Sequence, residues 1–227
     1  MRKIGLIGGI SWTSTIEYYK YINEGINQKL GNLNFAECII YSLNFGDVQE
    51  KGWVNSFPLL LNACETLKKS GAEAIVLCAN TAHLFADDLQ DKIGLPVISI
   101  ITATVNAVHN KRIKKIGLLG TKVIMEMEFY KHEFIKGGIE VLIPDQQTTR
   151  DYIQETLKNE LGKGIIKPET KTAYIAIANE LIANGAEGII LGCTEIPLII
   201  NTTDISVPVF DTTKIHSAAA VEFALSI

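Results

Sequence analysis

The chain has 227 residues, of which 47% are hydrophobic and 20% charged, and its formal net charge is −4. This length suits one large or two small domains, and the apolar content excludes a disordered chain. The negative charge argues against a surface that binds nucleic acid, and no apolar stretch approaches the roughly 20 residues that span a bilayer.

The first residues and the cysteines indicate where the protein is expected to work. Met1-Arg2-Lys3 leads directly into a strand-like run without a small-residue cleavage site, so we expect no signal peptide. The cysteines Cys38, Cys64, Cys78 and Cys193 are widely spaced and form no CxxC motif. This spacing argues against structural disulfides and a zinc site, and favours a reducing compartment. We therefore expect a cytoplasmic α/β protein without a metal.

In the first half of the chain, short β-branched runs alternate with longer helical stretches. Residues 3–7 predict a buried strand. The segment Ser14-Thr15-Ile16-Glu17 has the Ser-x-x-Glu form of a capping box, which predicts the start of a helix that stops near Gly31. Strands that alternate with helices of this length imply parallel βαβ units, buried on both faces. The further expected elements are strands at 38–43, 74–77 and 96–100 and helices at 59–70 and about 82–92.

The second half of the chain repeats the first. Three segments recur in the same order at offsets of 112 to 114 residues, which favours a duplicated domain over two coincidentally similar sheets. We therefore predict two pseudosymmetric α/β domains, each with a parallel sheet. The matching pairs are Lys3–Gly9 with Lys115–Thr121, Gly71–Leu77 with Gly185–Leu191, and Leu95–Ile98 with Val207–Phe210.

The repeat also predicts where a ligand binds. If a pseudo-twofold axis relates the two domains, the carboxyl ends of their strands face each other. Ligands of open parallel sheets bind just beyond these strand ends. We therefore expect the active site in the cleft between the two halves, lined by matched loops from each.

Two matched loops carry the residues of greatest chemical interest. The first reads Cys78-Ala79-Asn80-Thr81 and the second Gly192-Cys193-Thr194-Glu195. Neighbouring residues of a strand point to opposite faces, so the register decides which side chains correspond. Counted from Gly71 in the first repeat and from Gly185 in the second, Cys193 corresponds to Ala79, and Cys78 corresponds to Gly192.

Five motifs lie along the chain: Gly8-Gly9-Ile10-Ser11-Trp12, Leu77–His83, Leu118-Leu119-Gly120-Thr121, Gly192–Pro197 and Val209-Phe210-Asp211-Thr212. With these motifs, essentially the whole chain resembles the aspartate/glutamate racemase superfamily, the cofactor-independent amino-acid racemases. The resemblance implies a homodimer without a cofactor, in which the last strand and helix complete the first domain. The first domain then comprises 1–100 plus 207–227, and the second 101–206. Neither GxGxxG nor a P-loop is present to suggest a nucleotide site.

The resemblance also implies roles for individual residues. Racemisation removes the Cα proton on one face of an amino acid and returns a proton on the other, which two opposed acid/base groups can do. By its motif, Cys193 is a catalytic thiol, and Glu195 is its polar assistant. A thiolate serves as a base once nearby donors lower its pKa. The positions expected to hold the amino and carboxylate groups of a small amino acid or dicarboxylate are Ser11, Asn80, Thr81 and Thr194.

Two further residues have a functional and a structural interpretation each. Lys163, beside Gly164 in a loop after a predicted helix, is placed to meet a side-chain carboxylate of the substrate, and a solvated lysine is the alternative. His83 follows Asn-Thr at a helix start, where it is expected to cap or pack rather than to catalyse. The remaining histidines, His109, His132 and His216, show no constellation in the sequence.

The sequence departs from the family pattern at the first base position, because the alanine at 79 cannot transfer a proton. The loop after Gly120-Thr121 also has Ile124 where relatives commonly keep a threonine. Three explanations remain open: Cys78 swings in as the second base, the protein is a one-base enzyme or an inactive or specialised relative, or the alanine was introduced. An alternative function is that of a single-cysteine decarboxylase of the same superfamily. A third is an inactive amino-acid-binding protein.

Overall fold

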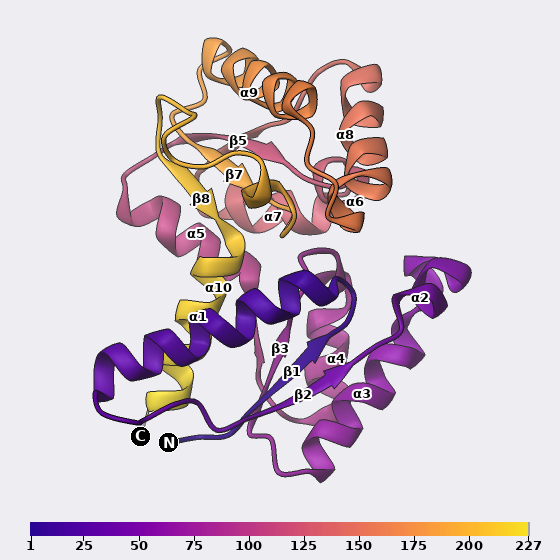
Figure 1. Ribbon diagram of the computed structural model, residues 1–227, viewed down its shortest axis with the longest axis vertical. Helices are drawn as coiled ribbons and strands as arrows, with labels where there is room; N and C mark the ends of the chain where they lie inside the picture. Colours follow the sequence, from indigo (N-terminus) through magenta and orange to yellow (C-terminus); the bar gives the residue numbers. More distant parts are fainter. Residues whose placement is uncertain (227) are drawn as a thin grey trace. The chain divides into compact units, whose positions relative to one another are not determined.

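The computed structural model of the protein describes residues 1–226, which form two compact units (Figure 1). Unit 1 comprises Met1–Ile100 and the chain from Thr213 onward, and unit 2 comprises Ile101–Thr212. Each unit contains a four-stranded parallel sheet with helices packed on it. The predicted α/β class with two parallel sheets is confirmed.

The sheet of unit 1 has the strand order β2-β1-β3-β4. Its strands all pair in parallel, because helices between them carry the chain back across the sheet, as expected for βαβ units. The structure adds a helix that the sequence analysis missed, α2. The elements are β1 (Ile4–Gly8), α1 (Trp12–Leu30), β2 (Cys38–Ser42), α2 (Phe45–Lys51), α3 (Phe57–Lys69), β3 (Ala74–Leu77), the 3₁₀ helix η2 (Thr81–Phe85), α4 (Ala86–Ile93), β4 (Val97–Ile98) and α10 (Thr212–Leu225).

The sheet of unit 2 has the corresponding order, β6-β5-β7-β8. Its strands are short, and three of them contain three residues each. The elements are α5 (Ile100–Asn110), β5 (Lys115–Leu119), α6 (Lys122–Glu126), α7 (Glu128–Lys136), β6 (Glu140–Leu142), α8 (Gln147–Asn159), the 3₁₀ helix η3 (Leu161–Lys163), α9 (Pro168–Ala183), β7 (Ile189–Leu191) and β8 (Val209–Asp211).

The internal repeat of the sequence corresponds to the strand pairing of the two sheets. In unit 1, Ile7 of β1 lies opposite Leu77 of β3, and in unit 2 Leu119 of β5 lies opposite Leu191 of β7. The edge strands β4 and β8 pair in the same relative register with β3 and β7. The repeated segments therefore occupy equivalent positions in two sheets of the same topology.

The boundary between the units differs from the expected one. The sequence predicts that residues 207–212 belong to the first domain, whereas β8 pairs with β7 and belongs to unit 2. The hydroxyl of Thr212 also donates to the carbonyl of Leu191, at 2.8 Å. Only α10 then returns to unit 1, where Ala220, Val221 and Ala224 are buried against α1 and the sheet. The strand stays with unit 2 because its backbone hydrogen bonds are made there.

The start of α1 corrects the predicted capping box. Ser11 is the N-cap, and its hydroxyl accepts a hydrogen bond from the backbone N–H of Ser14 at 3.3 Å. Ser14 itself is buried inside the helix. The helix begins earlier because Gly9 turns the chain with φ +80° directly after β1. Its end at Gly31, with φ +69°, agrees with the prediction.

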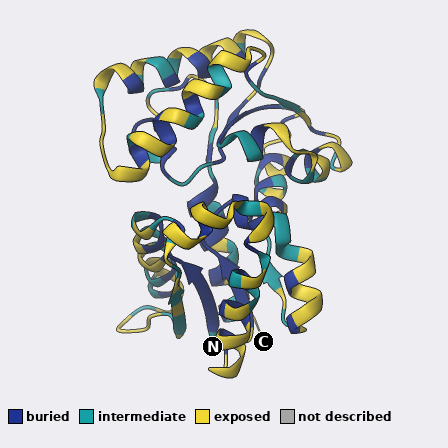
Figure 2. Ribbon diagram, turned by 90° about the vertical axis from the view of Figure 1, so that its right-hand side faces the viewer, coloured by how far each residue is buried: buried dark blue, intermediate teal, exposed yellow. Residues whose placement is uncertain are grey.

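Both units bury their central strands. β1 and β3 in unit 1 and β5 and β7 in unit 2 are almost entirely buried, whereas the edge strands β2, β4, β6 and β8 are mostly half-buried or exposed. Figure 2 shows exposed residues on the outward helix faces. In unit 1 one core lies on the side of α3 and α4 and a second on the side of α1 and α10. Among residues 1–226, none of the helices combines the length and the hydrophobicity that a membrane span requires.

The Gly9 turn gives a first prediction on stability. A Cβ atom at this position would lie 2.1 Å from the carbonyl oxygen of Leu43, and its φ of +80° is unfavourable for a residue with a side chain. We expect Gly9→Ala to destabilise unit 1 by about 2 to 3 kcal/mol, measured by urea unfolding. Gly94→Ala is the control, because Gly94 also has a positive φ, of +64°, but no atom within 4 Å of its Cβ position. Equal losses for both variants would contradict the steric argument.

Candidate active site

The turn between β1 and α1 places the first predicted site residue, Ser11. Its hydroxyl lies 2.9 Å from Oγ1 of Thr13 and caps α1, and the side chain is half-buried. The backbone of the turn is held from the other side, since the N–H of Gly9 donates to Oγ1 of Thr15 at 3.0 Å. Ser11 is thus oriented by local hydrogen bonds, and its contact with a substrate stays a prediction.

The end of β3 separates Cys78 from Ala79 by side-chain direction. Cys78 packs in the core beneath α1 and α10, and Ala79 packs in the core on the side of α3 and α4. The Sγ atom of Cys78 lies 3.8 Å from the carbonyl oxygen of Val76. Burial raises the pKa of the Cys78 thiol far above its ordinary value. Cys78 is therefore a protonated core thiol on the face opposite to Ala79.

Asn80 and Thr81 follow directly at the start of η2. Both are buried, with 4% and 5% of their surface exposed. Ile7 and Leu77 are partners in register. The loops that carry Ser11 and Asn80 therefore begin at the same end of the sheet of unit 1, beyond the carboxyl ends of β1 and β3. These two predicted binding loops are thus brought together by the pairing of β1 with β3.

The end of β7 holds the most distinctive group of the candidate site. The thiol of Cys193 donates to Oε2 of Glu195 over 2.8 Å, and the hydroxyl of Thr194 donates to the same oxygen over 3.1 Å. Glu195 is 8% exposed, whereas Cys193 is half-buried. Three predicted residues therefore form one hydrogen-bonded cluster in unit 2, which we call the thiol–carboxylate cluster.

The electrostatics of this cluster favour a protonated thiol. Burial raises the pKa of Cys193 well above its ordinary value, and the negative charge and hydrogen bond of Glu195 raise it further. Hydrogen bonds from the backbone N–H groups of Glu195 and Thr194 lower the pKa of Cys193. In the ligand-free state Cys193 is thus a proton donor to Glu195, and the two backbone N–H groups are in place to stabilise a thiolate.

Ile124 lies in α6, which follows the end of β5 in unit 2. Thr121 caps α6 by accepting from the N–H of Ile124 at 3.4 Å, and Ile124 is completely buried. A Cβ atom at Gly120 or Gly192 would lie 3.1 or 3.2 Å from Cγ2 of Ile124. Its side chain therefore packs directly on the backbone at the ends of β5 and β7, where it offers no hydrogen bond.

None of the hydrogen bonds just described involves Lys163. It ends η3, its backbone N–H donates to the carbonyl of Glu160 at 2.9 Å, and its side chain is exposed. Its expected contact with a substrate carboxylate stays a prediction.

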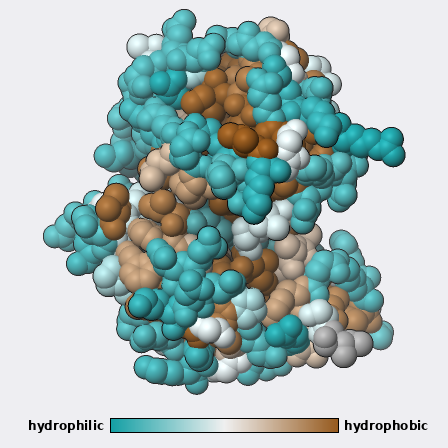
Figure 3. Space-filling view, turned by 180° about the vertical axis from the view of Figure 1, so that it is seen from behind, coloured by the Kyte–Doolittle hydropathy of each residue, from teal (hydrophilic) through white to brown (hydrophobic). Residues whose placement is uncertain are grey.

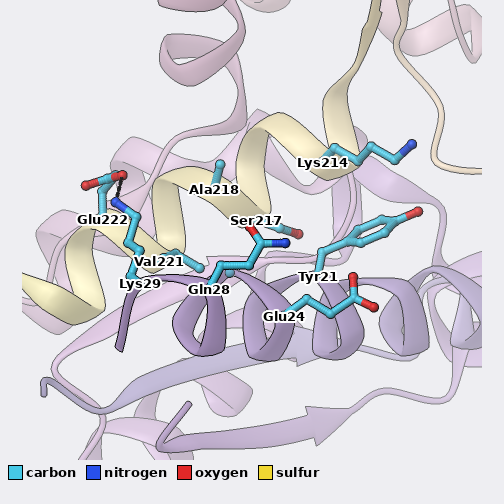
Figure 4. Close-up of a pocket in the computed structure, with 10 residues that line it drawn as sticks. Tyr21, Glu24, Gln28, Lys29, Lys214, Ser217, Ala218, Val221 and Glu222 are labelled. Atoms are coloured by element: carbon cyan, nitrogen blue, oxygen red, sulfur yellow. Dashed lines mark hydrogen bonds and ion pairs between the residues drawn. The ribbon is translucent and has the colours of Figure 1, made fainter. Parts of the chain in front are cut away.

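A separate cavity of about 270 Å³ opens between α1 and α10 (Figure 4). Lys29 and Glu222 form an ion pair at one end of it, and the ammonium of Lys214 lies 5.6 Å from the centre of the Tyr21 ring. The hydroxyl of Ser217 is buried with no hydrogen-bond partner. No predicted site residue lines this cavity. Its lining is Tyr21, Glu24, Gly25, Gln28, Lys29, Lys214, Ser217, Ala218, Val221 and Glu222.

A pair of buried histidines in unit 1 has no signal in the sequence. His83 and His216 are both buried, and their rings contact each other in unit 1. They are far apart in the sequence, so no local motif announces the pair. Within residues 1–226, no three His, Cys, Asp or Glu side chains are grouped so that they could hold a metal ion, and all four cysteines are free thiols.

Known proteins share this architecture over the whole chain. A crystal structure of a candidate Asp/Glu racemase from Yersinia pestis is 46% identical, with a TM-score of 0.91 and complete coverage of both chains. An aspartate racemase homologue from Pyrococcus horikoshii is 37% identical, with a TM-score of 0.86 and complete coverage of both chains. The protein therefore has the two-unit α/β architecture of the racemases.

The family follows from the sequence as a whole. The model of the Asp/Glu/Hydantoin racemase family matches residues 7–220, and the chain belongs to this family. Among curated proteins, the broad specificity amino-acid racemase RacX of Bacillus subtilis is 23% identical over 171 residues, which cover 74% of this chain and 71% of that protein. The suspected superfamily membership is thereby confirmed.

Proposed function

We propose that the protein is a cofactor-independent amino-acid racemase of the aspartate/glutamate type, with Cys193 as its acid/base. The observation that carries this proposal is the 2.8 Å hydrogen bond from the Cys193 thiol to Glu195. It joins a proton donor to an adjacent acceptor at the carboxyl end of a parallel strand, where α/β proteins bind ligands. The family and the names of its relatives support an amino acid as the substrate.

The proposed reaction begins with transfer of the thiol proton to the Glu195 carboxylate. The thiolate, stabilised by the N–H groups of Thr194 and Glu195, then removes the Cα proton, and the electron pair is delocalised into the substrate carboxylate. Ala79 has no proton to give, so water protonates Cα on the opposite face. The hydroxide formed in that step takes the proton from Glu195, which restores the starting state. Ser11, Asn80, Thr81 and Thr194 bind the amino and carboxylate groups, and Lys163 binds a side-chain carboxylate.

Hydrogen–deuterium exchange at Cα tests the proposal. The purified protein is incubated in D₂O with L- and D-aspartate and L- and D-glutamate. The products are separated by chiral chromatography, and their deuterium content is measured by mass spectrometry. We expect deuterated product of inverted configuration. Deuterium uptake with retained configuration means that Cys193 works on one face only, and no uptake from any of the four amino acids contradicts the proposal.

The pairing of Cys193 with Ala79 favours a second candidate function, that of a single-cysteine decarboxylase. An enzyme with one thiol protonates an enediolate on one face, and it needs no second base. Release of carbon dioxide from a substituted malonate, lost in Cys193→Ser, is the result expected of this activity. An amino-acid-binding protein without activity would instead gain thermal stability from its ligand and show neither exchange nor decarboxylation.

The alanine at 79 gives a direct prediction. We expect Ala79→Cys to raise the rate of racemisation about tenfold or more, because it adds a proton-transfer group at the position equivalent to Cys193. The rate of inversion by chiral chromatography is the measurement. Ala82→Cys is the matched control, since it adds a thiol to a buried position in the same segment and should leave the rate unchanged. No gain for Ala79→Cys would mean that this side of the site does not reach Cα.

We also propose that the enzyme is a cytoplasmic homodimer. The four free thiols support a reducing compartment. Figure 3, seen from behind Figure 1, shows apolar side chains at the surface among hydrophilic ones, on a face other than that of α1. On α1, Trp12, Ile16 and Tyr19 are 66%, 53% and 50% exposed, and their spacing places them on one helix face, as at an interface. We expect sedimentation to give a dimer and Ile16→Glu to give a monomer; an unchanged mass for the variant excludes this face.

A further inference from the structure

His83 and His216 form a buried aromatic cluster with Tyr18 in unit 1. The ring centroids of the two histidines are 5.2 Å apart, and Tyr18 meets the His216 ring edge-on at 5.5 Å. The three side chains are 4%, 0% and 0% exposed, in the order His83, His216, Tyr18. They come from η2, α10 and α1, which are distant in the sequence.

Every ring nitrogen of this pair is engaged, which fixes the tautomer of each histidine. The backbone N–H of Ile100 donates to Nε2 of His83 at 3.1 Å, so the proton of His83 is on Nδ1, which donates to the carbonyl of Ala79 at 3.0 Å. Nε2 of His216 donates to the carbonyl of Ile98 at 2.7 Å, so its Nδ1 accepts from the Tyr18 hydroxyl at 2.8 Å.

These hydrogen bonds reach backbone that belongs to the candidate site. Ala79 directly precedes Asn80, the N-cap of η2, and Thr81, its first residue. Ile98 and Ile100 form the link from β4 to α5, where the chain leaves unit 1. Burial lowers the pKa of both imidazoles, so they are neutral near pH 7 and keep this pattern.

We propose that His83 is a positioning residue of the enzyme, which holds the Ala79 carbonyl and thereby the Asn80–Thr81 backbone in the geometry that binds substrate. His216 and Tyr18 hold the His83 ring in place. His83 touches neither substrate nor Cα in this scheme, and it acts only through the loop. The inference rests on the proposed function for its kinetic consequence, whereas the consequence for the backbone does not depend on it.

Two amide variants of His83 separate its two hydrogen bonds. The side-chain nitrogen of asparagine lies where Nδ1 was, so His83→Asn keeps the donor to Ala79 and loses the acceptor for Ile100. In His83→Gln the longer side chain reaches the Nε2 position, so it keeps the acceptor and loses the donor to Ala79. Both variants replace a buried ring by an amide, and asparagine is the smaller of the two by one methylene. A loss of packing alone would therefore be larger in His83→Asn, opposite to the result that the proposal predicts.

The proposal predicts different results for the two variants. In hydrogen exchange followed by mass spectrometry, the amides of residues 79–82 should exchange about tenfold faster in His83→Gln and close to the wild-type rate in His83→Asn. With an amino acid that the wild type turns over, His83→Gln should raise KM about tenfold with kcat within about threefold, and His83→Asn should leave KM near normal.

Equal effects of the two variants on exchange and KM, or no effect of either, would overturn the proposal in favour of simple core packing. If neither variant folds, Tyr18→Phe decides, because it removes only the hydroxyl that holds His216 and should still accelerate exchange at residues 79–82; an unchanged rate there rejects the proposal. If the wild type turns over no amino acid, the proposed function fails, and the exchange experiment still tests the role of His83.

Discussion

We expect Cys193→Ser to lower the rate of Cα proton exchange by about a thousandfold or more while the protein remains folded. Serine has nearly the shape of cysteine, but its hydroxyl is far too weak an acid to become a base at neutral pH. Positioned acid/base groups contribute on the order of 10² to 10⁴ in rate, and Cys193 is the thiol in contact with Glu195. Turnover in D₂O and the circular dichroism spectrum are measured on the same preparation.

Cys38→Ser is the matched control for this substitution. Cys38 is also half-buried, but it lies on the edge strand β2 of unit 1, so its replacement should leave the exchange rate near that of the wild type. Near-normal exchange in Cys193→Ser would show that another group is the base.

Glu195→Gln distinguishes the two roles of the carboxylate, which raises the pKa of Cys193 and accepts its proton. Because the negative charge of Glu195 raises the pKa of Cys193, its removal should lower that pKa and move the rise of activity with pH toward lower pH. The maximal rate should also fall, since an amide cannot take up the thiol proton. A pH profile that does not move would separate Glu195 from the ionisation of Cys193.

The second large effect is a loss of stability of unit 1 on acidification from pH 6.5 to 4. In the folded protein, burial lowers the pKa of His83 to about 4 and that of His216 to about 3, whereas both start from 6.5 in the unfolded chain. Between these values the unfolded chain binds more protons, so stability is present above pH 6.5 and decreases as the pH falls. Each histidine is expected to lower the free energy of unfolding by about 1 kcal/mol per pH unit in this range.

Tryptophan fluorescence in urea measures this loss in unit 1 alone, because both tryptophans, Trp12 and Trp53, lie in that unit. The variant His83→Asn has one buried titrating group fewer, and its stability should depend on pH about half as steeply. A free energy of unfolding that is constant from pH 6.5 to 4.5 in the wild type would contradict the prediction.

The arrangement of the sheets was predictable because it depends on patterns that recur along the chain. Buried parallel strands need apolar runs of limited length, and the same runs return at offsets of 112 to 114 residues. The register of the repeat also predicted that Cys78 and Ala79 face opposite sides, and the two side chains do pack in different cores. Local sequence sufficed here because strand geometry alternates strictly.

Some predictions of local structure were wrong, because tertiary contacts determine which of several possible residues begins or ends an element. Ser11 and Ser14 are both capable N-caps, and the Gly9 turn, packed against Leu43, selects the earlier one. The predicted strand at 96–100 shrinks to Val97–Ile98, and α5 starts at Ile100, whose N–H is bound by His83. Residues 207–212 lie in unit 2, not in the first domain as predicted, because β8 forms its backbone hydrogen bonds with β7.

The sequence by itself determined the family, the parallel α/β class and the residues that follow the repeated strands, including Cys193, Glu195 and Asn80. These follow from patterns within a few residues or from a repeat of such patterns. Only the tertiary structure decided that the Cys193 thiol donates to Glu195, that Cys78 is a core thiol and that His83 and His216 form a pair. Ionisation and hydrogen bonding depend on burial and on partners brought from distant segments, and these exist only once the chain has folded.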